Sequence, residues 1–209
     1  MRKIEFLFIF ILITTSLVFA SYDGINAQTK LRDTPCSQKL KEKDLRPLVK
    51  EKGFFDKKLN EKGDFANDFV DNGDGTITDR ATGLMWEQGG SKKLTSFYRA
   101  KKYVKKLNKK KYAGHNNWRI PTIEELYSLL EPNRSKQLYI NPVFSTIPTH
   151  CWSADRSGLP SLVEKSGVDQ YLTLDYKEGT FSDAHDGFQP GGSSAGNWSS
   201  FIRAVRSSQ

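Results

Sequence analysis

The clearest structural signal in the sequence lies at residues 117–126, which read NWRIPTIEEL. Thr122 and Glu125 have the spacing of a capping box, in which the side chain of each accepts the backbone N–H of the other. Apolar residues recur at helical spacing behind them, so we predict a helix that begins at Thr122 and ends before Pro132. Arg119 lies close enough to form a buried ion pair with Glu125, and we expect that pair to order the turn before the helix.

A second helix is predicted over residues 96–108. Phe97, Ala100, Val104 and Leu107 recur at intervals of three and four residues, which places them on one apolar stripe. Either of the two hydroxyl residues just before Phe97 can cap the start. We therefore expect one face of this helix to pack on the core and the opposite face to be solvated.

Short strands are predicted on both sides of the two helices. Residues 69–70, 76–78 and 84–86 favour β structure and are separated by turn-forming residues, which indicates a β-meander. Residues 170–175 alternate like a half-buried strand, and residues 200–205 make a last strand. This pattern predicts the α+β class, as a compact loop-rich domain with two helices and short mixed or antiparallel sheets.

The N-terminal part of the chain divides into two segments. Residues 1–20 have a positive start, an apolar run and small residues at the end, which is typical of a secretory signal peptide. The alternative is an uncleaved membrane anchor, but the apolar run is shorter than the roughly 20 residues that span a bilayer. Residues 21–66 are polar and Lys-rich, and we expect a linker or loosely packed extension, with a helical turn near residues 38–50, before a domain at 67–209. The protein is then exported, to the periplasm, the cell surface or the medium, with no membrane span after cleavage.

The cysteine and histidine content excludes several kinds of site. Two cysteines are too few for a disulfide-dense miniprotein or a four-cysteine zinc module, and the three histidines form no zinc-binding pair. Because disulfides persist outside the cytosol, we expect Cys36 and Cys151 to be bridged; the alternative is two free thiols. No P-loop, dinucleotide-binding glycine motif or serine nucleophile elbow is present, so we expect no cofactor, no metal site and no catalytic residue.

The strongest physical signal is charge, because the chain has a formal net charge of +8. Between Gln88 and Ile123 there are eleven basic residues and no acidic one. A row of ammonium groups along a helix suits a linear polyanion such as a sulfated glycan, a lipopolysaccharide or a nucleic acid. The alternative is a solvated helix face without a ligand. In residues 154–186 the seven acidic residues outnumber the three basic ones, and this two-sided charge would steer ligands or drive head-to-tail self-association. The residues that we assign to a polyanion-binding face are Arg99, Lys101, Lys102, Lys105, Lys106, Lys109 and Lys110.

Several short blocks, in order along the chain, carry a family resemblance. Residues 69–79 (FVDNGDGTITD), followed by 82–86 (TGLMW), resemble the opening signature of the Lcl C-terminal domain family, which is named for a bacterial collagen-like adhesin. Residues 117–126 look like its central signature, and 152–153 (WS) and 201–206 (FIRAVR) resemble its later ones. The central and last blocks are also similar to the superfamily of formylglycine-generating enzymes and C-type-lectin-like domains.

The resemblance implies a C-type-lectin-like or formylglycine-generating-like domain and an adhesin type of function. The best-understood member of the family is an adhesin domain that binds sulfated glycosaminoglycans, so we expect an exported, non-enzymatic binding domain for anionic polymers. This chain lacks a collagen-like Gly-X-Y stretch, and Ala204 stands where some relatives carry cysteine. Two alternatives stay open: an enzyme on a formylglycine-generating-like scaffold, and a cell-envelope structural domain that binds another protein. The catalytic cysteines of the enzymes have no evident counterparts here.

Two short motifs allow a calcium interpretation but are better explained by local structure. Residues 71–75, DNGDG, lack oxygen ligands at the third and fifth positions of an EF-hand loop, so a tight hairpin turn is the better account. Residues 131–133, EPN, copy a tripeptide that holds calcium and sugar in mannose-type C-type lectins, without the downstream partner motif. Helix termination at Pro132 explains them better. The sequence leaves calcium binding and the oligomeric state open.

Overall fold

The computed structural model describes residues 28–31, 38–158, 169–185 and 199–208, and it confirms the α+β class. The elements follow one another as β1 (Lys39–Leu40), α1 (Glu42–Glu51), β2 (Phe69–Asp71), β3 (Thr76–Asp79), β4 (Leu84–Glu87), α2 (Phe97–Lys109), the 3-10 turn η1 (Tyr112–Gly114), α3 (Ile123–Tyr127), β5 (Leu130–Ser135), β6 (Leu138–Ile140), β7 (His150–Ser157), β8 (Gln170–Asp175), β9 (Thr180–His185) and β10 (Val205–Ser207). Residues 1–20, which we predicted to be a signal peptide, lie outside the described residues.

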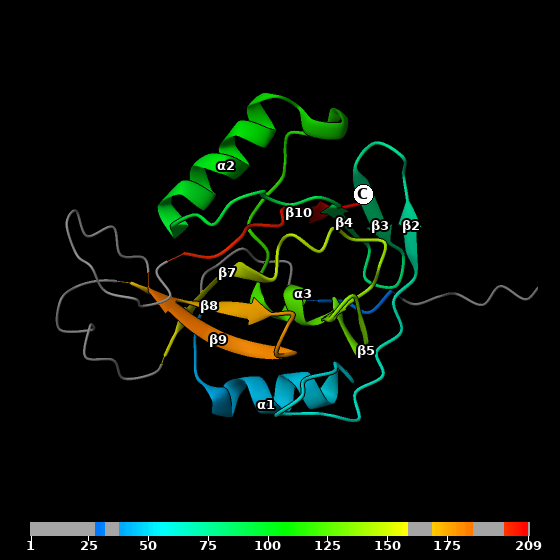
Figure 1. Ribbon diagram of the computed structural model, residues 1–209, viewed down its shortest axis with the longest axis vertical. Coiled ribbons are helices and arrows are strands. Elements are labelled where there is room, and N and C mark those ends of the chain that lie inside the picture. Colours follow the sequence, from blue (N-terminus) through cyan, green and yellow to red (C-terminus); the bar gives the residue numbers. More distant parts are fainter. Residues whose placement is uncertain (1–27, 32–37, 159–168, 186–198, 209) are drawn as a thin grey trace, which may run out of the picture.

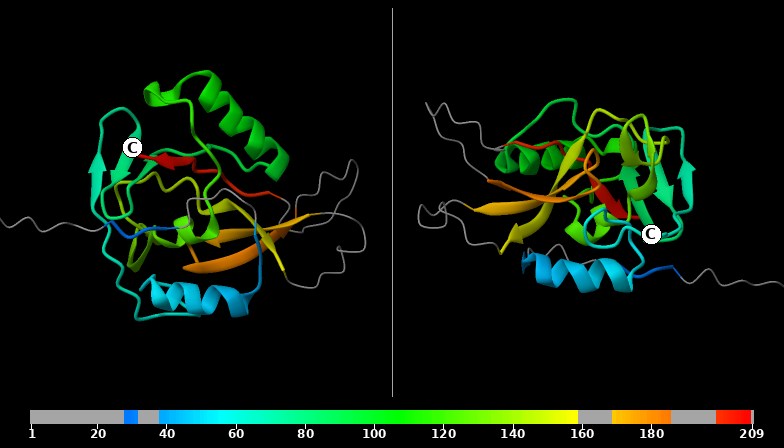
Figure 2. Two further views of the ribbon diagram at one scale, coloured as in Figure 1. Left: turned by 180° about the vertical axis from the view of Figure 1, so that it is seen from behind. Right: turned by 60° about the horizontal axis from the view of Figure 1, so that its bottom comes forward.

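The strands form two four-stranded sheets and one two-stranded sheet. The first has the order β1-β7-β8-β9, with β1 parallel to β7 and the other pairs antiparallel. The second has the order β10-β4-β3-β2 and is antiparallel throughout, and β5 pairs with β6. Figure 1 shows α2 and α1 on opposite sides of the molecule with the strands between them, and the view from behind in Figure 2 agrees.

The predicted meander is confirmed as β2, β3 and β4, and the DNGDG segment is the turn between the first two. The Asp71 carboxylate accepts from the backbone N–H of Gly73 at 2.9 Å, and that of Asp74 accepts from the N–H of Thr76 at 3.0 Å. Gly73 and Gly75 have φ values of 75° and 88°, which other residues rarely adopt. The acidic side chains therefore shape the hairpin, and the described residues contain no group of three or more His, Cys, Asp or Glu that could hold a metal ion.

The expected loose extension over residues 21–66 is wrong from Gln38 onward. Leu45, Val49 and Phe54 have no exposed surface and belong to the main hydrophobic core. The polar composition concealed an amphipathic pattern, because Leu45 and Val49 are four residues apart and occupy the same helix face. Helix α1 lies where a helical turn was expected near residues 38–50, and it is a full helix packed on the core.

Two predicted boundaries also differ from the structure. Helix α3 ends at Tyr127, well before Pro132, and residues 131–133 lie inside β5. The register of β5 against β6 is irregular between Leu130 and Ser135, so Pro132 is accommodated away from a regular ladder. The last strand is Val205–Ser207 instead of residues 200–205, where Ser200 makes only an isolated bridge with Thr95.

A second hydrophobic cluster lies beneath α2 and fixes that helix on the molecule. Phe97 stacks on Tyr171 with ring centroids 3.5 Å apart and meets Trp152 edge-on at 5.6 Å. Ala100 and Val104 complete the buried stripe, as the helical periodicity predicted. The opposite face of α2 is consequently turned to solvent.

Candidate anion-binding groove

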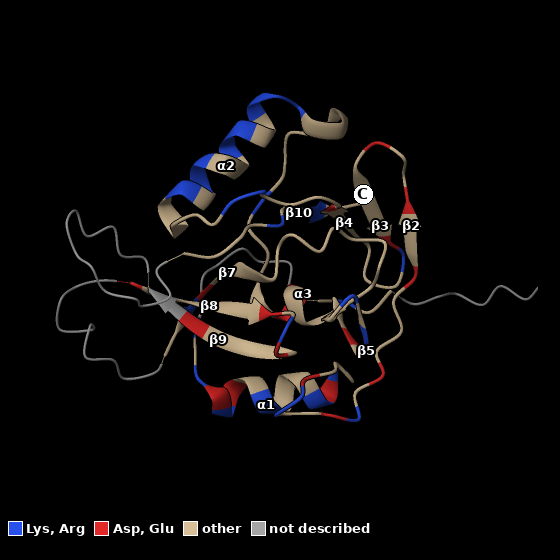
Figure 3. Cartoon of the chain, viewed as in Figure 1, with Lys and Arg blue, Asp and Glu red and all other residues tan. Residues whose placement is uncertain are grey.

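Helix α2 begins at Ser96, whose hydroxyl accepts the backbone N–H of Arg99 at 3.4 Å. Its first turn contains no acidic residue, and its last turn contains Lys106 and Lys109. Figure 3 shows basic residues along the whole helix and no acidic residue on it. All seven predicted polyanion-binding residues are exposed, and they are Arg99, Lys101, Lys102, Lys105, Lys106, Lys109 and Lys110.

The cations of α2 have no acidic partners in the part of the chain that the structure describes. The ion pairs found there lie elsewhere, for example between Arg80 and Asp68. Two of the lysines instead lie over aromatic rings, Lys101 at 5.3 Å from the ring centre of Phe97 and Lys102 at 4.5 Å from that of Tyr98. A hydrogen bond and the nearby charge of Lys102 lower the pKa of Tyr98. The ammonium groups therefore remain available to a mobile anion.

A groove of about 500 Å³ runs between α2 and the extended segment before it, and we call it the basic groove. Its residues are Ser91, Lys92, Lys93, Leu94, Thr95, Arg99, Lys102, Tyr103 and Lys106. Three of the seven predicted residues, Arg99, Lys102 and Lys106, line it. The other four, Lys101, Lys105, Lys109 and Lys110, lie on the exposed surface of the helix outside the groove.

The C-terminal part of the chain positions the second wall of the basic groove. The backbone N–H of Ser91 donates to the Ile202 carbonyl at 2.8 Å, and the Ile202 N–H donates to the Ser91 hydroxyl at 3.0 Å. Thr95 forms a bridge with Ser200, and its carbonyl accepts the Trp152 indole N–H at 2.8 Å. These contacts place Lys92 and Lys93 opposite α2. The sequence showed both lysines in the basic run, but no periodic pattern assigned them to the site.

Tyr103 joins the basic groove to the interior. Its hydroxyl donates a short hydrogen bond to the Glu87 carboxylate, which is 5 % exposed. Burial raises the pKa of Glu87, and the hydrogen bond from Tyr103 opposes that rise. The other oxygen of Glu87 accepts the Ala204 N–H at 3.3 Å. This carboxylate is thus engaged below Tyr103 and does not offer an open acidic partner to the groove.

The fully buried Arg203 fixes the same region from beneath. Its guanidinium donates to the backbone carbonyls of Glu87 and Ser145 at 3.0 and 2.9 Å, and also to that of Gln88. It lies 4.8 Å from the ring centre of Phe144. Arg203 therefore anchors the end of β4, from which the wall of the basic groove departs.

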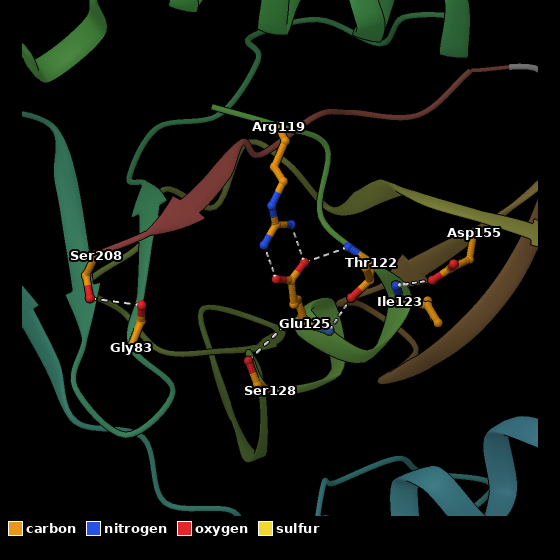
Figure 4. Close-up of polar contacts among 8 residues, drawn as sticks. All are labelled: Gly83, Arg119, Thr122, Ile123, Glu125, Ser128, Asp155 and Ser208. Atoms are coloured by element: carbon orange, nitrogen blue, oxygen red, sulfur yellow. Dashed lines mark hydrogen bonds and ion pairs between the residues drawn. The ribbon is translucent and has the colours of Figure 1, made fainter. Parts of the chain in front are cut away.

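The segment with the clearest sequence signal forms a structural cluster away from the basic groove (Figure 4). The Arg119 guanidinium donates two hydrogen bonds to the Glu125 carboxylate, at 2.7 and 2.5 Å. Glu125 also accepts the Thr122 N–H at 2.8 Å, and the Thr122 hydroxyl accepts the Glu125 N–H at 3.2 Å. Asp155 accepts the N–H of Ile123 at 2.9 Å. The capping box and the buried ion pair are both confirmed, and Glu125 has no exposed surface.

Cys151 has no exposed surface, and no disulfide bond to it is found among the described residues. Burial raises its pKa to about 11, so it is protonated at neutral pH. Its predicted partner, Cys36, lies outside the described residues, and the bridge therefore stays a prediction. His150 lines a separate polar pocket of about 220 Å³, where burial lowers its pKa.

None of the helices in the described residues combines the length and the apolar character needed to cross a bilayer. The comparisons with curated proteins and with solved structures find no match. Residues 75–206 match the model of the Lcl C-terminal domain family. That range contains β4, α2, the capping box and most of the C-terminal segment that supports the basic groove. Because the match covers more than half of the sequence, this chain belongs to the Lcl C-terminal domain family.

Proposed function

We propose that this protein is an exported, non-enzymatic binding domain that recognises anionic polymers, such as sulfated glycosaminoglycans, through the basic groove. Membership of the Lcl C-terminal domain family supports an adhesin-like domain in general. The observation that carries the finer proposal is the groove itself. Five cations line it, none with a carboxylate partner among the described residues, and they are Lys92, Lys93, Arg99, Lys102 and Lys106.

The arrangement favours an extended polyanion over a single small anion. Cations on two walls, one formed by α2 and the other by Lys92 and Lys93, neutralise successive negative groups along one chain. Each such contact releases condensed counterions, so binding weakens steeply as salt rises. Lysine predominates over arginine, and lysine acts as a point charge instead of a bidentate fork. We therefore expect selectivity for charge density more than for a particular sugar or base.

The enzyme alternative gains no comparable support. A thiol nucleophile must be accessible and ionised, whereas Cys151 is buried with a pKa of about 11. Within the basic groove, the described lining residues offer hydroxyl and ammonium groups but no carboxylate, imidazole or thiol. This composition suits charge recognition better than acid–base chemistry.

The test is elution of residues 21–209, the expected mature chain, from heparin and from a plain cation exchanger. The groove variant changes Lys92, Lys93, Lys102 and Lys106 to Gln. Its matched control changes four exposed lysines in and shortly after α1, on the far side of the molecule (Figure 1), namely Lys43, Lys50, Lys57 and Lys58.

Both variants lose the same charge, so they should shift alike on the exchanger. On heparin, we expect the groove variant to elute at much lower salt and the control to elute near the native protein. Equal shifts of both variants on heparin would contradict the proposal, because binding would then follow net charge and not the basic groove.

A further inference from the structure

The basic groove is bordered by exposed apolar side chains that a soluble polyanion does not need. Among the described residues, the large apolar side chains with most exposure are Leu94, Tyr98 and Ile147, at 51, 55 and 50 %. Two of the three, Leu94 and Tyr98, flank the start of α2. Single exposed apolar residues are ordinary on protein surfaces, but this pair lies within a strongly basic surface.

Lys102 is associated with both apolar residues. It lines the basic groove together with Leu94, and its ammonium group lies 4.5 Å from the ring centre of Tyr98. Tyr98 and Lys102 are one helical turn apart and therefore share a face of α2. Leu94 lies on the rigid wall that is held by the Thr95–Ser200 bridge. The surface thus presents an apolar pair and a cation in fixed positions.

This combination matches the chemistry of a membrane–water interface. Apolar and aromatic side chains enter the boundary between headgroups and acyl chains, while lysines extend to lipid phosphates. Tyrosine is enriched at that depth because its ring is apolar and its hydroxyl is polar. An anionic leaflet also presents a dense array of negative groups, which complements the row of cations on α2.

We propose that the exposed face of α2 docks on an anionic lipid bilayer, with Leu94 and Tyr98 inserted among the headgroups and the lysines bound to lipid phosphates. The proposal rests on the proposed function, since the same cations serve both. It adds that the anionic array is a lipid surface and that two apolar side chains contribute to binding.

The fold limits how deep this docking goes. Phe97, Ala100 and Val104 are buried in the second hydrophobic cluster and cannot turn toward lipid while the domain is folded. Attachment therefore depends on charge and on two side chains, so it is peripheral, reversible and weakened by salt. Removing one lysine near the bilayer lowers the partition coefficient about fivefold.

The test is co-sedimentation of residues 21–209 with phosphatidylcholine vesicles that contain phosphatidylglycerol, beside vesicles of phosphatidylcholine alone. An apolar variant changes Leu94 and Tyr98 to Gln and keeps every lysine. A conservative variant, Leu94→Met with Tyr98→Trp, keeps the apolar character. Thermal melting and heparin elution of each variant report whether the domain and its charged surface are intact.

We expect the native protein to bind only the anionic vesicles. The apolar variant should lose about tenfold in partition coefficient on vesicles, because the transfer of two half-exposed side chains is lost. Its retention on heparin should change much less, because every lysine is kept. The conservative variant should bind like the native protein. Failure of the native protein to sediment, or equal partitioning of the apolar variant, overturns the inference. Retention on heparin without vesicle binding rejects the lipid surface and leaves polymer binding in place.

Discussion

The buried pair of Arg119 and Glu125 allows a stability prediction that isolates the effect of burial. In the variant Arg119→Met, the side chain keeps an apolar stem, but the Glu125 carboxylate loses both bonds, at 2.7 and 2.5 Å. Only the Thr122 N–H then donates to that carboxylate among its described hydrogen bonds. The side chains are 18 and 0 % exposed, so the native Glu125 carboxylate depends on protein donors and not on solvent.

Breaking such a pair by removing one member costs about 3 kcal/mol or more of unfolding free energy, because an unpaired charge is left in the interior. For a chain of this length, that loss corresponds to a Tm lower by about 10 °C. The matched control is Arg80→Met. Arg80 holds Asp68 with the same two-bond geometry, at 2.9 and 3.0 Å, but these side chains are 65 and 43 % exposed. An exposed pair contributes at most about 1 kcal/mol, so Tm should fall by no more than about 3 °C.

Thermal unfolding followed by circular dichroism measures both variants. A double variant, Arg119→Met with Glu125→Gln, should recover part of the loss, because the glutamine carbonyl still accepts the Thr122 N–H and no buried charge remains. If Arg119→Met lowers Tm no more than Arg80→Met does, burial does not set the strength of the pair.

Two further predictions concern buried titratable groups. Burial raises the pKa of Glu87 above its ordinary 4.5, so the native state holds the proton in a pH range where the unfolded chain has lost it. The free energy of unfolding should therefore fall as pH rises from 4.5 to that higher pKa. In urea titrations, the unfolding free energy of Glu87→Gln should depend less on pH over this range. If the pH dependence is the same in the variant, other groups cause it. Cys151, as the one thiol of a Cys36→Ser variant, should resist a thiol reagent until the protein unfolds, because it is buried and its pKa is about 11. Rapid labelling of the folded variant would show that the thiol is accessible.

Short sequence patterns were sufficient to predict the elements that are specified by interactions within one segment. The capping box at Thr122 and Glu125, the apolar stripe of α2 and the strand β8 each lie within one short segment, and each was predicted. The expected half-burial of β8 was wrong, because its four central residues are all buried. For α1 only a helical turn near residues 38–50 was expected. Its packing on the core was not predicted, because Leu45 and Val49 are sparse within a Lys-rich run. The assignment of Pro132 to the end of a helix was wrong, because proline can also lie in an irregular strand.

The basic groove could be predicted only in part, because tertiary contacts build one of its walls. The helical period identified Arg99, Lys102 and Lys106 as an exposed row. The position of Lys92 and Lys93 depends on the bond between Ser91 and Ile202, which are 111 residues apart in the chain. No local pattern reports a contact at that separation. The sequence therefore predicted a charged helix face, whereas the structure adds the second wall.

The like charges along α2 destabilise the helix itself. Lys101 and Lys105, and likewise Lys102 and Lys106, are like-charged pairs at a spacing that destabilises a helix by about 0.2–0.5 kcal/mol each. The first turn also lacks the acidic residues that would favour the positive end of the helix dipole. Packing of Phe97 against Tyr171 and Trp152 offsets these costs from the buried side. A bound anion, whether a polymer or a lipid headgroup, would relieve the same repulsion from the exposed side, so the charge that weakens the free helix is the charge that a ligand stabilises.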